Sequence, residues 1–146
     1  MTSRGFARAI GAVFVTAGVL GFIPGLKSPA APLSPPLSMH GGYGLLFGLF
    51  AVNWIHNLVH LGIGLSAWRS SRTMVEARRF ARGLALFYGA LAVMGLIPAL
   101  NSAVGLIPLF GHDTWLHAGT AAAAAYFGYA PRMEAMEIRE RYRRAA

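Results

Sequence analysis

Long apolar runs alternate with short polar segments along this chain of 146 residues. Four runs contain no Lys, Arg, Asp or Glu, and they cover residues 9–26, 43–67, 83–100 and 114–131. A helix of eighteen residues rises about 27 Å, close to the roughly 30 Å hydrocarbon thickness of a bilayer. The pattern therefore predicts an all-α protein, an integral membrane four-helix bundle with four spans and a single transmembrane domain.

The first and third runs resemble each other. Residues 7–26 align without gaps on residues 81–100, and seven of the twenty positions are identical. Both copies end in Gly-x-Ile-Pro-x-Leu, in which the proline ends the helix or tilts its last turn. We therefore expect two repeated transmembrane hairpins. A cleaved signal peptide is the alternative for the first run, because arginines precede it and small residues follow it.

Composition and charge agree with a membrane location. Hydrophobic residues make up 55% of the chain and charged residues 12%, against roughly 25% charged in soluble domains. The net charge of +8 could suit nucleic acid, but twelve of the thirteen Lys and Arg residues lie before the first run, in residues 69–82, or in residues 132–146. This distribution follows the positive-inside rule. We expect a multi-pass protein of the bacterial cytoplasmic (inner) membrane, with both termini cytoplasmic and no nucleic-acid partner.

The connecting segments have distinct compositions. Residues 27–40 contain four prolines and are predicted to form an extended loop on the outer side. Residues 101–113 are a short, largely apolar outer connection. The basic tail, residues 132–146, is predicted to be a solvated cytoplasmic helix, because two Glu-to-Arg pairs occur at i,i+4 spacing. Small residues at 119–125 predict a closely packed helix face.

Polar side chains interrupt the second run on one side of its predicted helix. At about 100° per residue, Asn53, His56, Asn57 and His60 fall within one arc roughly 100° wide, together with Gly64. We call the four polar side chains the polar seam. Polar groups within a membrane usually bond to neighbouring helices. The main expectation is therefore that the seam joins helices.

A second polar group, His112, Asp113 and His117, lies at the outer edge of the fourth run, and hydropathy places His117 roughly 20 Å from His60 in depth. His56 and His60 are spaced for one metal ion, but the runs contain no further Asp, Glu or Cys ligand, so no metal site is predicted. A haem or a chlorophyll-type pigment needs only one or two axial imidazoles. His56 or His60 is the candidate ligand in that alternative, whereas the main expectation is no cofactor.

Catalysis has little support in the sequence. The chain has no cysteine, and Ser-x-x-Lys, Gly-x-Ser-x-Gly and His-Glu-x-x-His are all absent from it. We predict no catalytic residue and no enzymatic activity. A small oligomeric channel or proton-coupled transporter is a further alternative, which would require several copies of so short a chain.

The order of the motifs resembles a family of small bacterial four-helix integral membrane proteins catalogued as a domain of unknown function. The resemblance rests on His-Asn-x-x-His in the second run, Asp-x-x-x-His at the start of the fourth, and the two Ile-Pro endings. It covers residues 7–130, and residues 105–111 are similar to forms from photosynthetic bacteria. The resemblance implies an architecture and no activity. We therefore expect a non-enzymatic accessory or structural subunit of a larger membrane complex, and a photosynthetic complex is one form of this expectation. The expected partners are the bilayer and other membrane subunits or further copies of this chain.

Overall fold

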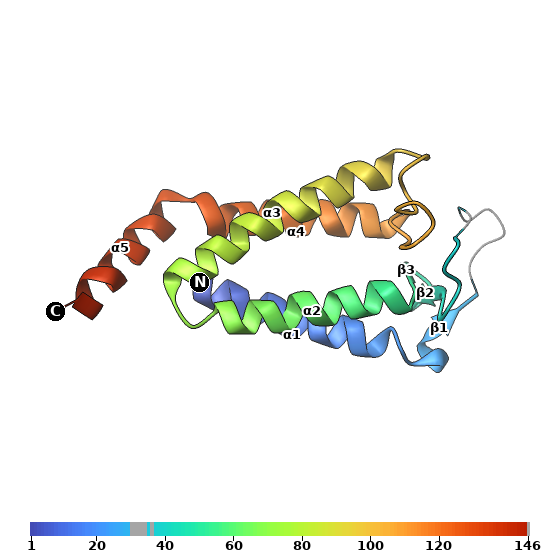
Figure 1. Cartoon of the computed structure of the whole chain (residues 1–146), viewed down its shortest axis with the longest axis horizontal. Helices are drawn as coiled ribbons and strands as arrows, with labels where there is room; N and C mark the ends of the chain where they lie inside the picture. The colour runs from blue at the N-terminus through green and yellow to red at the C-terminus, as the bar shows by residue number, and fades with distance from the viewer. Residues whose placement is uncertain (30–34, 36, 146) are drawn as a thin grey trace.

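The computed structural model describes residues 1–29, 35 and 37–145 (Figure 1). Within these residues the chain is helical, with one small antiparallel sheet in the order β1-β2-β3. The elements are α1 (Ser3–Leu20), η1 (Pro24–Leu26), β1 (Lys27–Ser28), β2 (Gly44–Leu46), β3 (Phe50–Val52), α2 (Trp54–Ser70), α3 (Met74–Leu96), α4 (His112–Tyr129) and α5 (Pro131–Ala145). Residues 30–34 and 36 of the predicted extended loop lie outside the described residues.

The predicted four-span membrane bundle is wrong. Among the described residues, only α1 and α3 are long and apolar enough to cross a membrane, by length and composition. The second predicted span, residues 43–67, fails most clearly, because its first part forms β2 and β3 and its helix begins only at Trp54. The structure is instead a five-helix chain with a three-stranded sheet, and its two long apolar helices hint at association with a membrane.

Local capping explains the late start of α2. The Oδ1 atom of Asn53 accepts a hydrogen bond from the backbone N–H of His56 at 2.9 Å, which caps the helix. Just upstream, Phe47 and Gly48 have φ angles of 54° and 73° and turn the chain between β2 and β3. The Gly-rich segment therefore folds back as a hairpin before the helix can begin.

The other predicted spans are shifted along the sequence. The predicted first span, residues 9–26, is replaced by α1, which ends at Leu20 in a turn that leads to η1. The predicted third span, residues 83–100, is replaced by α3, which starts nine residues earlier at Met74 because Thr73 caps it by accepting from the N–H of Glu76. The predicted fourth span and tail correspond to α4 and α5, with a break at Ala130.

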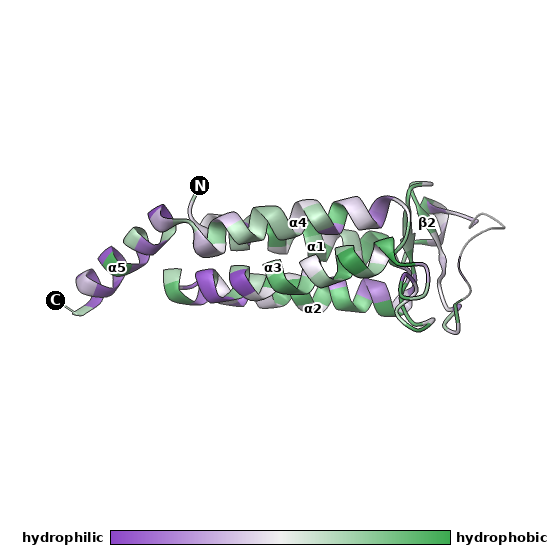
Figure 2. Cartoon of the chain, turned by 90° about the horizontal axis from the view of Figure 1, so that it is seen from above, coloured by the Kyte–Doolittle hydropathy of each residue, from purple (hydrophilic) through white to green (hydrophobic). Residues whose placement is uncertain are grey.

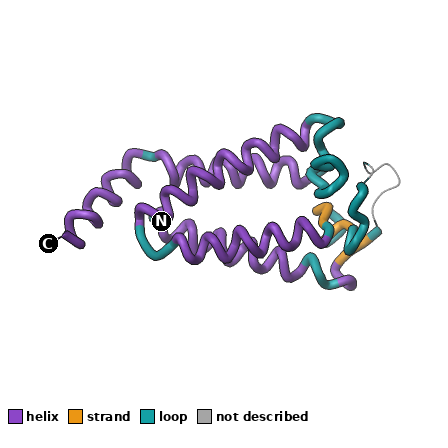
Figure 3. The backbone as a smooth tube through the Cα atoms, viewed as in Figure 1, coloured by secondary structure: helices purple, strands orange, loops and turns teal. Residues whose placement is uncertain are grey.

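The four longer helices lie side by side in two pairs, α1 with α2 and α3 with α4 (Figures 1 and 3). Contacts of α1 with α3 join the pairs, and buried side chains of α1, α3 and α4 form the core: Phe6, Phe14, Ala81, Leu84, Tyr88 and Ala124. Of the predicted close-packed stretch, residues 119–125, Ala124 is buried, whereas Gly119, Ala122 and Ala123 are exposed. Hydrophilic residues gather toward the two ends of the bundle, and apolar residues fill its middle (Figure 2).

Candidate functional site

Three histidines meet in the interior at the end of the bundle that carries the sheet. The ring centroid of His56 lies 4.4 Å from that of His60 and 6.2 Å from that of His117. Their exposed fractions are 3%, 8% and 2%, so all three are nearly removed from solvent. Phe14 and Tyr88 pack against this histidine cluster, with centroids 5.3 Å from His60 and 5.1 Å from His117. Four helices therefore contribute to one buried group.

Strand β3 links the histidine cluster to Asp113. The N–H of Ala51 donates to Oδ2 of Asp113 at 2.9 Å, and its carbonyl oxygen lies 3.1 Å from Nδ1 of His56. Because a carbonyl oxygen only accepts, Nδ1 of His56 carries the proton. Burial raises the pKa of Asp113 to about 7, although the hydrogen bond from Ala51 acts in the opposite direction. Near neutral pH this buried carboxyl group therefore exchanges between its protonated and ionised forms.

Asn53 joins three segments that are distant in the sequence. Its Nδ2 atom donates to the carbonyl oxygens of Met39 at 3.2 Å and Leu106 at 2.7 Å, while its Oδ1 atom caps α2. The side chain is fully buried. A single amide thus connects α2 with the segment between β1 and β2 and with the loop between α3 and α4.

The other two side chains of the polar seam, Asn57 and His60, have buried polar atoms without a hydrogen-bond partner among the described residues. Both polar side-chain atoms of Asn57 are buried and have no hydrogen-bond partner among the described residues. The same holds for Nδ1 of His60 and Nδ1 of His117. Asn53 and His56 are therefore bonded to the backbone, whereas Asn57 and His60 retain hydrogen-bonding capacity inside the bundle.

The structure corrects the predicted separation of the histidines. His117 was expected roughly 20 Å from His60 in depth, but it lies beside His56 and in the same cluster as His60. The cause is the late start of α2, which places His56 in the first turn, at the same end of the bundle as the start of α4. Asn53, three residues before His56, is an N-cap signal in the sequence that marks this start.

The structure separates the three residues of the predicted outer-edge group, His112, Asp113 and His117. Asp113 and His117 are buried and join the cluster, whereas His112 is exposed in the first turn of α4. Tyr88 is a member of the cluster that the sequence analysis missed, because no motif distinguishes it from other core aromatics. Among the described residues, no group of three or more His, Cys, Asp or Glu side chains is placed to hold a metal ion.

His60 and Asp113 also line an apolar cavity of about 420 Å³ between α1, the sheet and the start of α4. Most of its wall is apolar and includes Val13 of α1 and Leu116 of α4. Phe47 contributes as well, held at a φ of 54° that bulky residues rarely adopt. Small-molecule sites are typically apolar cavities of about 300–1,000 Å³ with a few polar groups, and this cavity, which we call the His60 cavity, has that character.

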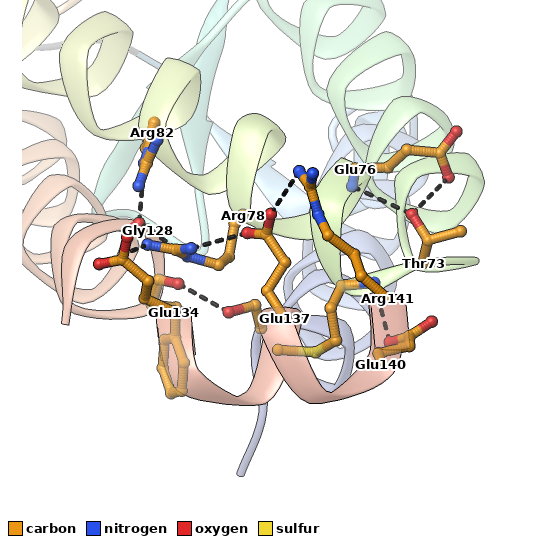
Figure 4. A network of polar contacts seen from close by, with 12 residues as sticks. Thr73, Glu76, Arg78, Arg82, Gly128, Glu134, Glu137, Glu140 and Arg141 are labelled. Carbon is orange, nitrogen blue, oxygen red and sulfur yellow. Dashed lines mark hydrogen bonds and ion pairs between the residues drawn. The ribbon is translucent and has the colours of Figure 1, made fainter. Parts of the chain in front are cut away.

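At the opposite end of the bundle, ion pairs hold α5 against α3 (Figure 4). Nη1 of the buried Arg78 donates to Oε2 of Glu137 at 2.6 Å, and Nε donates to the carbonyl oxygen of Gly128 at 3.3 Å. Burial alone would raise the pKa of Glu137, but hydrogen bonds and charges from Arg78 and Arg141 outweigh it and hold the pKa below its usual value. Glu137 is therefore ionised at neutral pH.

The fold and site define a helical protein with two candidate membrane helices and a buried polar cluster. The chain belongs to the family described as domain of unknown function DUF4383, whose model matches residues 4–130. This match confirms the resemblance noted from the motifs to a family of unknown function. No curated protein and no solved structure matches the chain. Neither the family nor the fold supports the expected link to photosynthesis.

Proposed function

We propose that the protein is a non-enzymatic accessory or structural subunit of a larger complex in the bacterial cytoplasmic membrane. The observation that carries this proposal is the outward apolar surface of its helices. Val13 on α1, Leu58 and Leu65 on α2 and Leu86 and Val93 on α3 are all more than half exposed, with 70% exposure at Leu86. Large apolar side chains spread over several helices favour contact with lipid or with other subunits.

The buried polar groups support a role in assembly of the fold. The backbone of Ala51 bonds to both Asp113 and His56, and Asn53 bonds to two loops, so polar groups join the α1–α2 pair to the α3–α4 pair. Hydrogen bonds of this kind stabilise helix packing where apolar burial between helices gives little advantage.

Extraction and co-purification test the proposal together. The full chain is expressed at native level with a small affinity tag, its membranes are washed with alkaline carbonate, and a mild detergent extract is purified and sized. We expect the protein to stay in the washed membranes and to arrive with stoichiometric partner chains or further copies of itself. Release by carbonate would overturn the membrane location, and a lone monomer from the native extract would overturn the subunit role.

A second candidate is binding of a haem or chlorophyll-type pigment, favoured by the His60 cavity. His60 lines that cavity, and its Nδ1 atom has no hydrogen-bond partner among the described residues, whereas Nδ1 of His56 is bonded to Ala51 and the His56 ring packs against those of His60 and His117. An absorption spectrum of protein from native membranes tests this candidate, with His60→Phe as the variant and exposed His112→Phe as the control. A band lost only in His60→Phe supports it, and a colourless wild-type protein refutes it.

A further inference from the structure

A cavity of about 520 Å³ lies at the end of the bundle away from the histidine cluster, where the starts of α1 and α3 meet α5. Its wall includes apolar atoms of Met74 and Met136 and the first turn of α1. The charged side chains that line it are four arginines and one glutamate: Arg4, Arg8, Arg139, Arg143 and Glu140. We call this site the arginine cavity. It shares no residue with the polar seam or with the His60 cavity.

The single acidic group of the arginine cavity is already engaged. Oε2 of Glu140 accepts from the N–H of Met74 at 3.2 Å and lies 3.9 Å from Nη1 of Arg4. The other oxygen, Oε1, forms an ion pair with Arg144 at 2.6 Å. Arg4 is fixed further, because its Nε atom donates to the carbonyl oxygen of Ser71 at 3.0 Å. Glu140 therefore positions Arg4 and α5 and cannot neutralise the remaining arginines.

Three guanidinium groups of the arginine cavity have no counter-charge among the described residues. Arg8, Arg139 and Arg143 form no hydrogen bond or ion pair through their side chains within the described residues. No acidic residue lies in the first turn of α1, whose free N–H groups add positive potential at the same place. Several positive charges that line one cavity favour the binding of an anion there, and the planar guanidinium group matches the oxygens of a phosphate group.

We propose that the arginine cavity binds the phosphate group of an anionic phospholipid. This inference rests on the proposed membrane location, because α1, a candidate membrane helix, begins at the cavity and so places it at the bilayer surface. Basic clusters beside membrane helices attract anionic lipids of the cytoplasmic leaflet. Met74 and Met136 supply apolar contacts for the glycerol and the first acyl carbons, which inorganic phosphate would not use.

Native mass spectrometry of the full chain in a neutral detergent tests the proposal. The probes are dioctanoyl phosphatidylglycerol, dioctanoyl phosphatidylcholine and inorganic phosphate. The variant is Arg139→Gln/Arg143→Gln, and the control is Arg72→Gln/Arg132→Gln, which removes the same charge from exposed positions outside the cavity. We expect saturable binding of phosphatidylglycerol, at least about tenfold weaker binding in the variant, and a change below about twofold in the control.

Each other outcome overturns the proposal in a distinct way. Equal weakening in both double variants would show diffuse charge attraction and no specific site. Inorganic phosphate that displaces the lipid at equal concentration would show a site for free anions, and equal binding of phosphatidylcholine would remove the role of the headgroup charge. A protein that resists carbonate extraction but binds no phosphatidylglycerol refutes this inference and leaves the proposed membrane location standing.

Discussion

The close approach of α1 and α2 at Gly64 gives a prediction that the structure makes quantitative. A Cβ atom at Gly64 would lie 2.7 Å from Cγ2 of Val15 and 2.9 Å from both the carbonyl oxygen of Gly11 and the backbone nitrogen of Val15. Because two of these atoms belong to the backbone, the helices must move apart. Overpacking of this kind costs about 1–3 kcal/mol, and alanine regains about 1 kcal/mol of helix propensity. We expect Gly64→Ala to lower the free energy of unfolding by up to about 2 kcal/mol.

Gly62→Ala is the matched control, on the same helix two residues away. A Cβ atom there meets no atom within 4 Å, so only the gain in helix propensity of up to about 1 kcal/mol applies. Thermal unfolding of both variants, followed by circular dichroism in one detergent, measures the difference. A change of 1 kcal/mol shifts Tm by roughly 2–4 °C in a chain of this size. Equal shifts of both variants in the same direction would refute the packing argument.

Three further predictions concern buried polar groups. The pKa of Asp113 is raised to about 7, so this group binds more protons in the folded chain and its contribution to stability falls as pH rises from about 4 to about 7, whereas burial lowers the pKa of His60 and His117 to about 4 and makes their contribution rise with pH. Asp113→Asn removes only the first contribution, so thermal unfolding at stepped pH should show the Tm of the variant rising relative to that of the wild type from pH 4 to pH 7, and a constant difference in Tm would contradict the raised pKa. Arg78→Gln leaves Glu137 without its buried partner and should cost about 3 kcal/mol and open α5 to trypsin. Arg144→Gln removes an exposed partner, the arginine paired with Glu140, and should cost less than about 1 kcal/mol. Equal losses would contradict the argument from the burial of the two arginines. Asn53→Ala removes the cap and two loop contacts and should lower the free energy of unfolding by about 2–4 kcal/mol, and an unchanged Tm would contradict its joining role.

The second predicted span shows where sequence patterns failed. Residues 43–67 are apolar throughout, and hydropathy does not distinguish a helix from a short buried strand. The pairing of β2 with β1 depends on Lys27 and Ser28, which lie some sixteen residues upstream, and no local pattern encodes that contact. Local signals were present nonetheless, because Asn53 is a good N-cap and Gly48 suits a positive φ.

The composition of the histidine cluster was only partly predictable. The spacing of His56 and His60 correctly puts both side chains on one buried helix face, because helical periodicity is a local property. The addition of Asp113 and His117 depended on the relative depth of α2 and α4, which neither helix encodes by itself. The predicted start of the second helix was wrong by about eleven residues. At 1.5 Å per residue, this error displaces the predicted position of a side chain by roughly 16 Å, so groups that are in contact were predicted to lie apart.

The sequence by itself determined the helical character, the apolar surfaces, the family and the distribution of charge, because each depends on composition or on residues close together in the chain. Only the tertiary structure decided which polar groups meet: the histidine cluster with Asp113 at one end, and the arginines of α1 and α5 around one cavity at the other. The physical reason is that these contacts depend on helix ends and relative positions. Strand pairing and close packing at glycine set those relative positions through residues far apart in the chain.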